Sequence, residues 1–83
     1  MKQIKFYNTK TFETFTATNK VALAKELYRT SFCRVSSKDV YDWCSKCADR
    51  VEIVHDVQLH FDRYDLVGFV NELLKHNIIG RTN

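Results

Sequence analysis

The stretch that decides the fold is VYDWCSKCADRVEIV, residues 40–54. Its apolar positions, spaced four, three, four and three residues apart, are Val40, Cys44, Cys47, Val51 and Val54. This spacing keeps the side chains on one face of an α-helix. Ser36 or Ser37 precedes the stretch and can accept hydrogen bonds from the free N–H groups of a first turn. We therefore predict a helix over residues 37–53 whose cysteine-bearing face lies in the core.

The N-terminal third predicts a β-hairpin followed by a helix. Residues 2–8 and 11–17 alternate or are rich in β-branched and aromatic residues, and Asn8-Thr9-Lys10 can connect two antiparallel strands. Phe12 and Phe15 fall on opposite faces, so we expect one of them to be exposed. Thr18-Asn19 offers an N-cap for a helix over residues 20–30.

The C-terminal third predicts a third strand and a last helix. Val57, Leu59 and Phe61 alternate with polar residues, which is typical of a short strand over residues 57–61. Asp62 can cap a helix over residues 63–76, and Asn77 suits the left-handed position after a helix. The predicted order is β-β-α-α-β-α. It indicates one α+β domain over residues 1–83, a small antiparallel sheet with three helices packed on it.

Composition and charge narrow the class of protein. The chain has 83 residues, no Pro, three Cys and a net charge of +3. Residues 1–41 hold eight Lys/Arg against three acids, hence +5, whereas residues 42–83 hold five against seven, hence −2. A basic half can steer toward nucleic acid or an acidic protein surface. The sequence contains no apolar segment typical of a signal peptide or membrane span, and its odd cysteine count favours a reducing compartment. We expect a cytoplasmic protein that does not contact membranes.

The Trp43-Cys44-Ser45-Lys46-Cys47 string admits three interpretations. It resembles a thioredoxin-type redox motif, but Cys44 falls inside the predicted helix and the chain lacks the cis-proline of such folds. Cys44, Cys47, His55 and His60 are instead candidate zinc ligands, because a tetrahedral ion accepts two thiolates and two imidazoles. The third interpretation, which we prefer, makes Cys44 and Cys47 small buried hydrophobic residues and predicts no cofactor.

No other pattern indicates catalysis. The sequence contains no Gly-rich phosphate loop, nucleophile elbow or paired carboxylates, so we expect a non-enzymatic protein. Basic residues interleaved with aromatic ones are suited to phosphate contact and base stacking. Exposed aromatic and arginine side chains also supply much of the energy of protein interfaces. The candidate partner-binding residues are Lys5, Tyr7, Phe12, Arg29, Arg34 and Trp43.

The order of segments resembles small proteins encoded by bacteriophages and other mobile elements. The resemblance rests on TATNKVAL (residues 16–23), on Tyr41, Ala48 and Arg50 in the Ser-capped helix, and on FVNELL (residues 69–74) before Ile78-Ile79. Several such proteins, including anti-CRISPR proteins, inhibit bacterial defence systems by binding them. The resemblance implies a phage-type inhibitor of a host protein or ribonucleoprotein complex in the host cytoplasm.

The sequence leaves two alternative functions open, and it is also compatible with a homodimer. The first alternative is a nucleic-acid-binding regulator that uses the basic N-terminal half, and the second is a zinc-stabilised interaction module. A homodimer formed through the exposed edge of the hairpin is compatible with all three functions.

Overall fold

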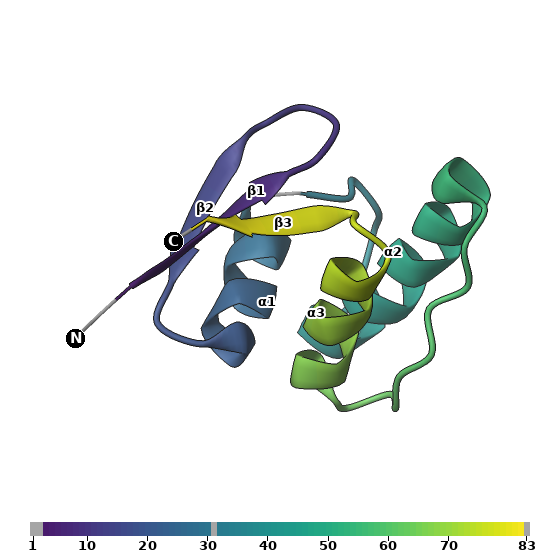
Figure 1. The fold of residues 1–83 in the computed structure, drawn as a ribbon. Helices are drawn as coiled ribbons and strands as arrows, with labels where there is room; N and C mark the ends of the chain where they lie inside the picture. The colour runs from purple at the N-terminus through teal and green to yellow at the C-terminus, as the bar shows by residue number, and fades with distance from the viewer. Residues whose placement is uncertain (1–2, 31, 83) are drawn as a thin grey trace.

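The fold is a three-stranded antiparallel sheet with three helices, described for residues 3–30 and 32–82 in the computed structural model (Figure 1). The elements are β1 (Ile4–Asn8), β2 (Thr14–Ala17), α1 (Lys20–Arg29), α2 (Val40–His55), α3 (Leu66–Lys75) and β3 (Ile79–Thr82). The strands lie in the order β2-β1-β3, so β1 is central. The predicted α+β class, with an antiparallel sheet and three helices, is confirmed.

The predicted hairpin is present, with a longer loop than expected. Phe6 on β1 lies opposite Phe15 on β2, and both side chains are buried on the inner face. Phe12 is exposed, as the alternation predicted for one of the two phenylalanines. β2 begins at Thr14 rather than at residue 11 because the main chain turns first, with the N–H of Phe12 donating to the carbonyl oxygen of Asn8 at 2.7 Å. Residue 2 of the expected first strand lies outside the described residues.

The first two helices match the sequence with one shifted start. Asn19 caps α1 as predicted, its side chain accepting from a first-turn N–H at 2.8 Å. α2 begins later than expected, because Asp39, and not Ser36 or Ser37, supplies the cap at 2.9 Å. An aspartate side chain is a strong N-cap and its charge is favoured at the positive end of the helix dipole.

The third helix leads directly into the third strand. Asp65 caps α3 at 2.8 Å, one turn later than the predicted cap Asp62. Asn77 takes the predicted left-handed conformation, with φ of 57°. Ile78 and Ile79 then fold back into the core as expected, and Ile79 also begins β3, which pairs with β1.

The predicted strand over residues 57–61 is wrong. The segment is extended but has no strand partner, and the observed order is β1, β2, α1, α2, α3, β3. Its alternation has another cause: Val57, Leu59 and Phe61 are half-buried against the core. The N–H of His60 donates to the carboxylate of Glu72 at 2.9 Å instead of to a strand. The third strand of the sheet is instead β3, which pairs with β1.

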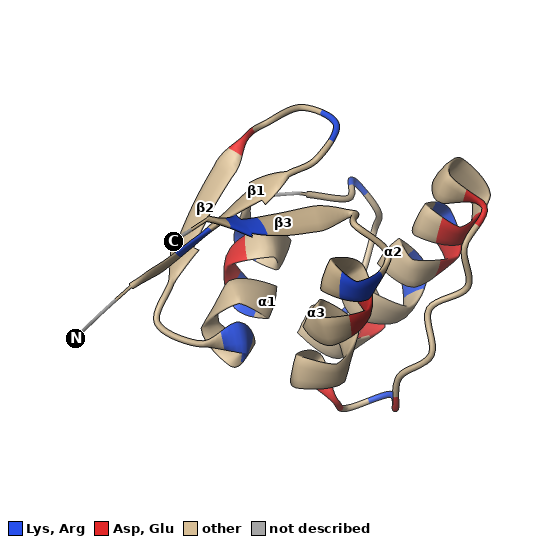
Figure 2. Cartoon of the chain, viewed as in Figure 1, with Lys and Arg blue, Asp and Glu red and all other residues tan. Residues whose placement is uncertain are grey.

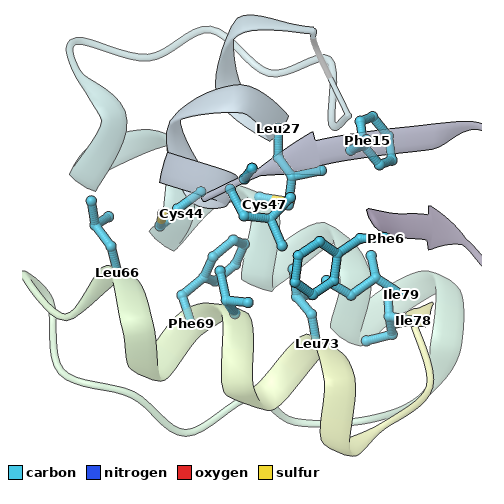
Figure 3. Packing of buried hydrophobic residues seen from close by; sticks show 14 of the residues in the cluster. Phe6, Phe15, Leu27, Cys44, Cys47, Leu66, Phe69, Leu73, Ile78 and Ile79 are labelled. Carbon is cyan, nitrogen blue, oxygen red and sulfur yellow. The ribbon is translucent and has the colours of Figure 1, made fainter. Parts of the chain in front are cut away.

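The core lies between the sheet and the helices (Figure 3). α1 packs against β2 and α3, and α2 packs against α1 and α3 rather than on the sheet itself. Cys44, Cys47 and Val51 are buried as the helical spacing predicted. The last turn of α2 extends past this core, which leaves Val54 54% exposed and Ile53 83% exposed.

Trp43 is a core residue, contrary to its prediction as a partner contact. Its side chain is 1% exposed and packs edge-on against Phe69, with ring centroids 5.8 Å apart. The indole N–H donates to the carbonyl oxygen of Cys33 at 2.9 Å. A tryptophan whose only donor is satisfied can be buried without penalty. In the described part of the chain, the helices are too short or too polar to traverse a bilayer.

Candidate functional site

Cys33 and Cys47 form a disulfide that joins the α1–α2 connection to the middle of α2. Their Cα atoms lie 5.6 Å apart, a normal separation for this bond. Cys47 is buried as predicted, but its sulfur is bonded to Cys33, a pairing that the sequence did not predict. Cys44 remains free and buried, and burial raises the pKa of its thiol to about 12. Because the thiolate is the nucleophile and metal ligand, a protonated thiol of this kind is chemically inert.

The structure does not bring the four zinc candidates together. The sulfur of Cys47 is bonded to Cys33, and the side chain of Cys44 lies in the core. Across residues 3–30 and 32–82, no three His, Cys, Asp or Glu side chains gather in a way that would hold a metal ion. The candidate binding site of this region is instead a pocket beside the disulfide.

A pocket of about 370 Å³ lies next to Cys33. Three separate segments supply most of its lining: the β1–β2 loop, the α1–α2 connection and the last two turns of α2, and Ile78 before β3 completes it. The lining side chains that carry or can carry positive charge are Lys10, Arg34, Arg50 and His55. No acidic residue belongs to its lining. We call this site the basic pocket.

The positive charges of the basic pocket are not neutralised by carboxylates. In the described residues, the ion pairs of the molecule involve other basic side chains: Arg29, Lys46, Lys75 and His76. Partial burial, and then the positive charge of Lys10, lower the pKa of His55. Figure 2 shows Lys or Arg positions on the β1–β2 loop, on the α1–α2 connection and along α2. The pocket therefore has a net positive field that favours an anion.

Hydrogen bonds of Asn8 and Thr9 hold the start of the loop that carries Lys10. The side chain of Asn8 accepts from the N–H of Lys10 at 2.9 Å. The hydroxyl of Thr9 donates to the carbonyl oxygen of Asn77 at 2.7 Å. The main-chain N–H of Thr9 donates to the carbonyl oxygen of Ile78 at 3.2 Å. These bonds tie the hairpin loop to the start of β3. Lys10 thus projects from a main chain of defined geometry.

The connection that carries Arg34 is fixed by its neighbours on both sides. The N–H of Phe32 donates to the carbonyl oxygen of Leu27 at 3.0 Å, which continues the end of α1. The disulfide and the indole N–H of Trp43 both hold Cys33, the residue before Arg34. Two arginines, on the connection and on α2, are therefore kept near one another by a covalent link.

The six predicted partner contacts separate into four groups. Arg34 lines the basic pocket. Lys5 and Tyr7 share the outer face of β1, and the ring of Phe12 stacks on that of Tyr7 with centroids 6.5 Å apart. Arg29 pairs with Glu26 on its own helix. Trp43, as described above, is buried in the core.

Sequence reasoning did not nominate Arg50 as a site residue and considered His55 only as a candidate zinc ligand. A signal for both existed in the helical spacing. Positions 50 and 51 lie three and four residues after position 47, and positions 54 and 55 lie four residues after 50 and 51, so all five share one face of α2. The stripe that buries Cys47 thus continues into the basic pocket where the helix leaves the core.

Comparisons of the chain with protein-family models, with curated proteins and with solved structures find no match. The basic pocket is therefore interpreted from its own geometry and charge.

Proposed function

We propose that the chain is a non-enzymatic binding protein that takes up the phosphates of a nucleic acid in its basic pocket. The observation that carries this proposal is the convergence of Lys10, Arg34 and Arg50, from three separate segments, around one hollow without a carboxylate. Arginine and lysine neutralise phosphate charge, and the planar guanidinium can donate two hydrogen bonds to one phosphate. This function corresponds to the nucleic-acid-binding alternative derived from the sequence.

The chemistry of the pocket favours binding over turnover. Arginine and lysine side chains stay protonated near neutral pH, so they attract anions without moving protons. Cys33 contributes a disulfide and not a nucleophilic thiolate. The pKa of His55 is lowered by burial and by Lys10, and no carboxylate of the lining orients its imidazole. Its protonation would add one charge to the site.

The proposal predicts a defined salt dependence. Each phosphate neutralised on a single strand contributes about 0.7 to the slope of log K against log salt concentration. Three permanent charges in the pocket therefore predict a slope of about −2. The measurement is fluorescence anisotropy of a labelled oligonucleotide, titrated with protein at several salt concentrations.

A matched pair of arginine variants tests the location of the site. Arg50→Gln should weaken binding and reduce the slope by about 0.7. Arg63→Gln is the control, because Arg63 is exposed on the segment before α3, outside the basic pocket. Absence of binding even at low salt, or equal effects of the two substitutions, would refute the proposed function.

Inhibition of a host defence complex stays a prediction, and so do cytoplasmic location and homodimer formation. The inhibitor role is supported by the size and segment order of the chain and by the exposed side chain of Phe12, a candidate interface residue. If this role is correct, Phe12→Ala should abolish protection of an infecting phage while the variant stays folded. Unchanged protection would remove Phe12 from such an interface.

A further inference from the structure

The side chain of Phe12 lies outside the hydrophobic core. Its side chain is 72% exposed, and its main chain is left-handed with φ of 61°. A residue with a Cβ is disfavoured there, and an exposed phenylalanine gains little from the hydrophobic effect. Non-glycine residues in this conformation concentrate at binding sites, where the surrounding structure holds them in place.

Hydrogen bonds on each side of Phe12 hold it in this conformation. Its own N–H donates to the carbonyl oxygen of Asn8 at 2.7 Å. The N–H of Glu13 donates to the hydroxyl of Thr11 at 3.3 Å, and the N–H of Asn8 donates to the carbonyl oxygen of Glu13 at 2.8 Å. The main chain at Phe12 is therefore held in place, and its side chain is exposed to solvent. A group ordered before binding loses less entropy when its ligand arrives.

Tyr7 supports Phe12 from the outer face of the sheet. The two rings are nearly parallel, with an interplanar angle of 16°. Tyr7 faces Gly80 on β3, and a methyl group at Gly80 would overlap the tyrosine ring. The missing side chain at Gly80 thus lets the ring lie close over the strand. We call the pair of rings, Tyr7 and Phe12, the aromatic platform.

The aromatic platform adjoins the basic pocket along the chain. Lys10 and Thr11 line the pocket and are followed directly by Phe12. Lys5 lies two residues from Tyr7 on the same outer face and is exposed. Glu13 is the acidic residue of this loop. Two exposed lysines, Lys5 and Lys10, thus lie within two residues of the rings of the aromatic platform along the chain.

We propose that the aromatic platform stacks the bases of a single-stranded nucleic acid whose phosphates enter the basic pocket. This inference rests on the proposed function and specifies its ligand. Aromatic rings bind unpaired bases, whose faces are accessible, whereas in a duplex those faces are covered by neighbouring base pairs. Cationic groups beside the rings neutralise the phosphates of the same strand.

Three oligonucleotides of equal length test the inference: an oligothymidylate, an abasic strand and a duplex. Phe12→Ala should weaken binding of the oligothymidylate by roughly 5- to 150-fold, the range for loss of one stacked base. Binding of the abasic strand should change little, because it retains phosphates but has no bases. Wild-type protein should prefer the oligothymidylate to the duplex at equal salt.

Two further substitutions at Phe12 and one elsewhere serve as controls. Phe12→Trp should preserve binding, whereas Phe12→Leu, which is apolar without a ring, should lose it. Tyr64→Ala removes an aromatic side chain of similar exposure, 69%, that lies outside both the aromatic platform and the basic pocket. It should leave affinity unchanged. Thermal melting of each variant verifies that it is folded.

The outcomes separate this inference from the proposed function. If wild-type protein binds the abasic strand and the oligothymidylate equally, and Arg50→Gln weakens both, the aromatic platform is refuted and the basic pocket stands. Equal binding by Phe12→Leu and wild type also refutes stacking. If wild type binds none of the three oligonucleotides, both proposals fail.

Discussion

Reduction of the Cys33–Cys47 disulfide should lower the free energy of unfolding by about 3 kcal/mol. The two residues are 14 positions apart, and closing a loop of about 15 residues removes roughly that much chain entropy from the unfolded state. A chain of 83 residues has a total stability of roughly 4–12 kcal/mol at 0.05–0.15 kcal/mol per residue. The disulfide thus supplies a quarter or more of the total.

Urea denaturation, with and without a phosphine reductant, measures this difference directly. The buried Trp43, whose indole N–H bonds to Cys33, makes tryptophan emission a reporter of the region. With a urea m-value of about 1–3 kcal/mol/M, the midpoint should fall by roughly 1–3 M on reduction. Reduction removes no side-chain atoms, so the shift reflects the cross-link and not a cavity.

Two variants show which cysteines are responsible. Cys44→Ala keeps the disulfide, so its midpoint should still fall when reductant is added. Cys33→Ser cannot form the disulfide, so its midpoint should match that of the reduced wild type and ignore the reductant. If reductant leaves the wild-type midpoint unchanged, or shifts that of Cys33→Ser equally, the assigned pairing is wrong.

Three smaller perturbations test the site and the fold. Affinity for an oligonucleotide should rise as pH falls from about 7.5 to 5.5, because His55 gains a proton beside the bound phosphate. In the free protein, burial and Lys10 lower the pKa of His55. His55→Gln should remove most of this pH dependence, which affinities measured across the range would show. Gly80→Ala should displace the ring of Tyr7 and lower the free energy of unfolding by about 1–2 kcal/mol, measured in urea; an unchanged midpoint would contradict the close packing. Asp39→Ala should reduce stability by about 1 kcal/mol through loss of the α2 cap, whereas no loss would indicate an alternative cap.

Local periodicity accounts for what the sequence predicted correctly. Helical spacing predicts one apolar face for the last helix, made of Leu66, Phe69, Val70, Leu73 and Leu74. The first four side chains are buried and that of Leu74 is half-buried against the core. The hairpin and the Asn19 cap were likewise predicted from neighbouring residues. Such features depend on contacts within a few positions of the chain, so they can be inferred without knowing the tertiary structure.

The third strand could not be placed from local pattern. Alternation over residues 57–61 reports that one side of an extended segment is buried, and it says nothing about a hydrogen-bonding partner. Ile79 begins the real strand, but only Ile78 and Ile79 are apolar before Gly80, which is too short a run to predict a strand. β3 exists because α3 ends at the open edge of β1, a property of the assembled fold.

The candidate site depends on distances that the sequence does not contain. Cys33 lies in an irregular connection, and its sulfur reaches Cys47 only after α1 and α2 have packed together. Lys10, Arg34 and Arg50 are separated by 24 and 16 positions, so their shared pocket has no local signature. Basic patches of this kind emerge only from the tertiary structure.

The placement of charge on α2 provides an independent argument for a ligand. Lys46 pairs with Asp42 one turn earlier at 3.2 Å, which is the usual way a helix neutralises a cation. Arg50 has no acid at either neighbouring turn, where Lys46, Cys47, Ile53 and Val54 stand. Because Arg50 lines the basic pocket together with Lys10 and Arg34, an anion that binds there meets several positive charges at once. A ligand that binds the folded chain alone also stabilises it by RT ln(1 + [L]/Kd). Oligonucleotide should thus raise the melting temperature of wild type more than that of Arg50→Gln, and an equal rise in both would place the bound phosphates elsewhere.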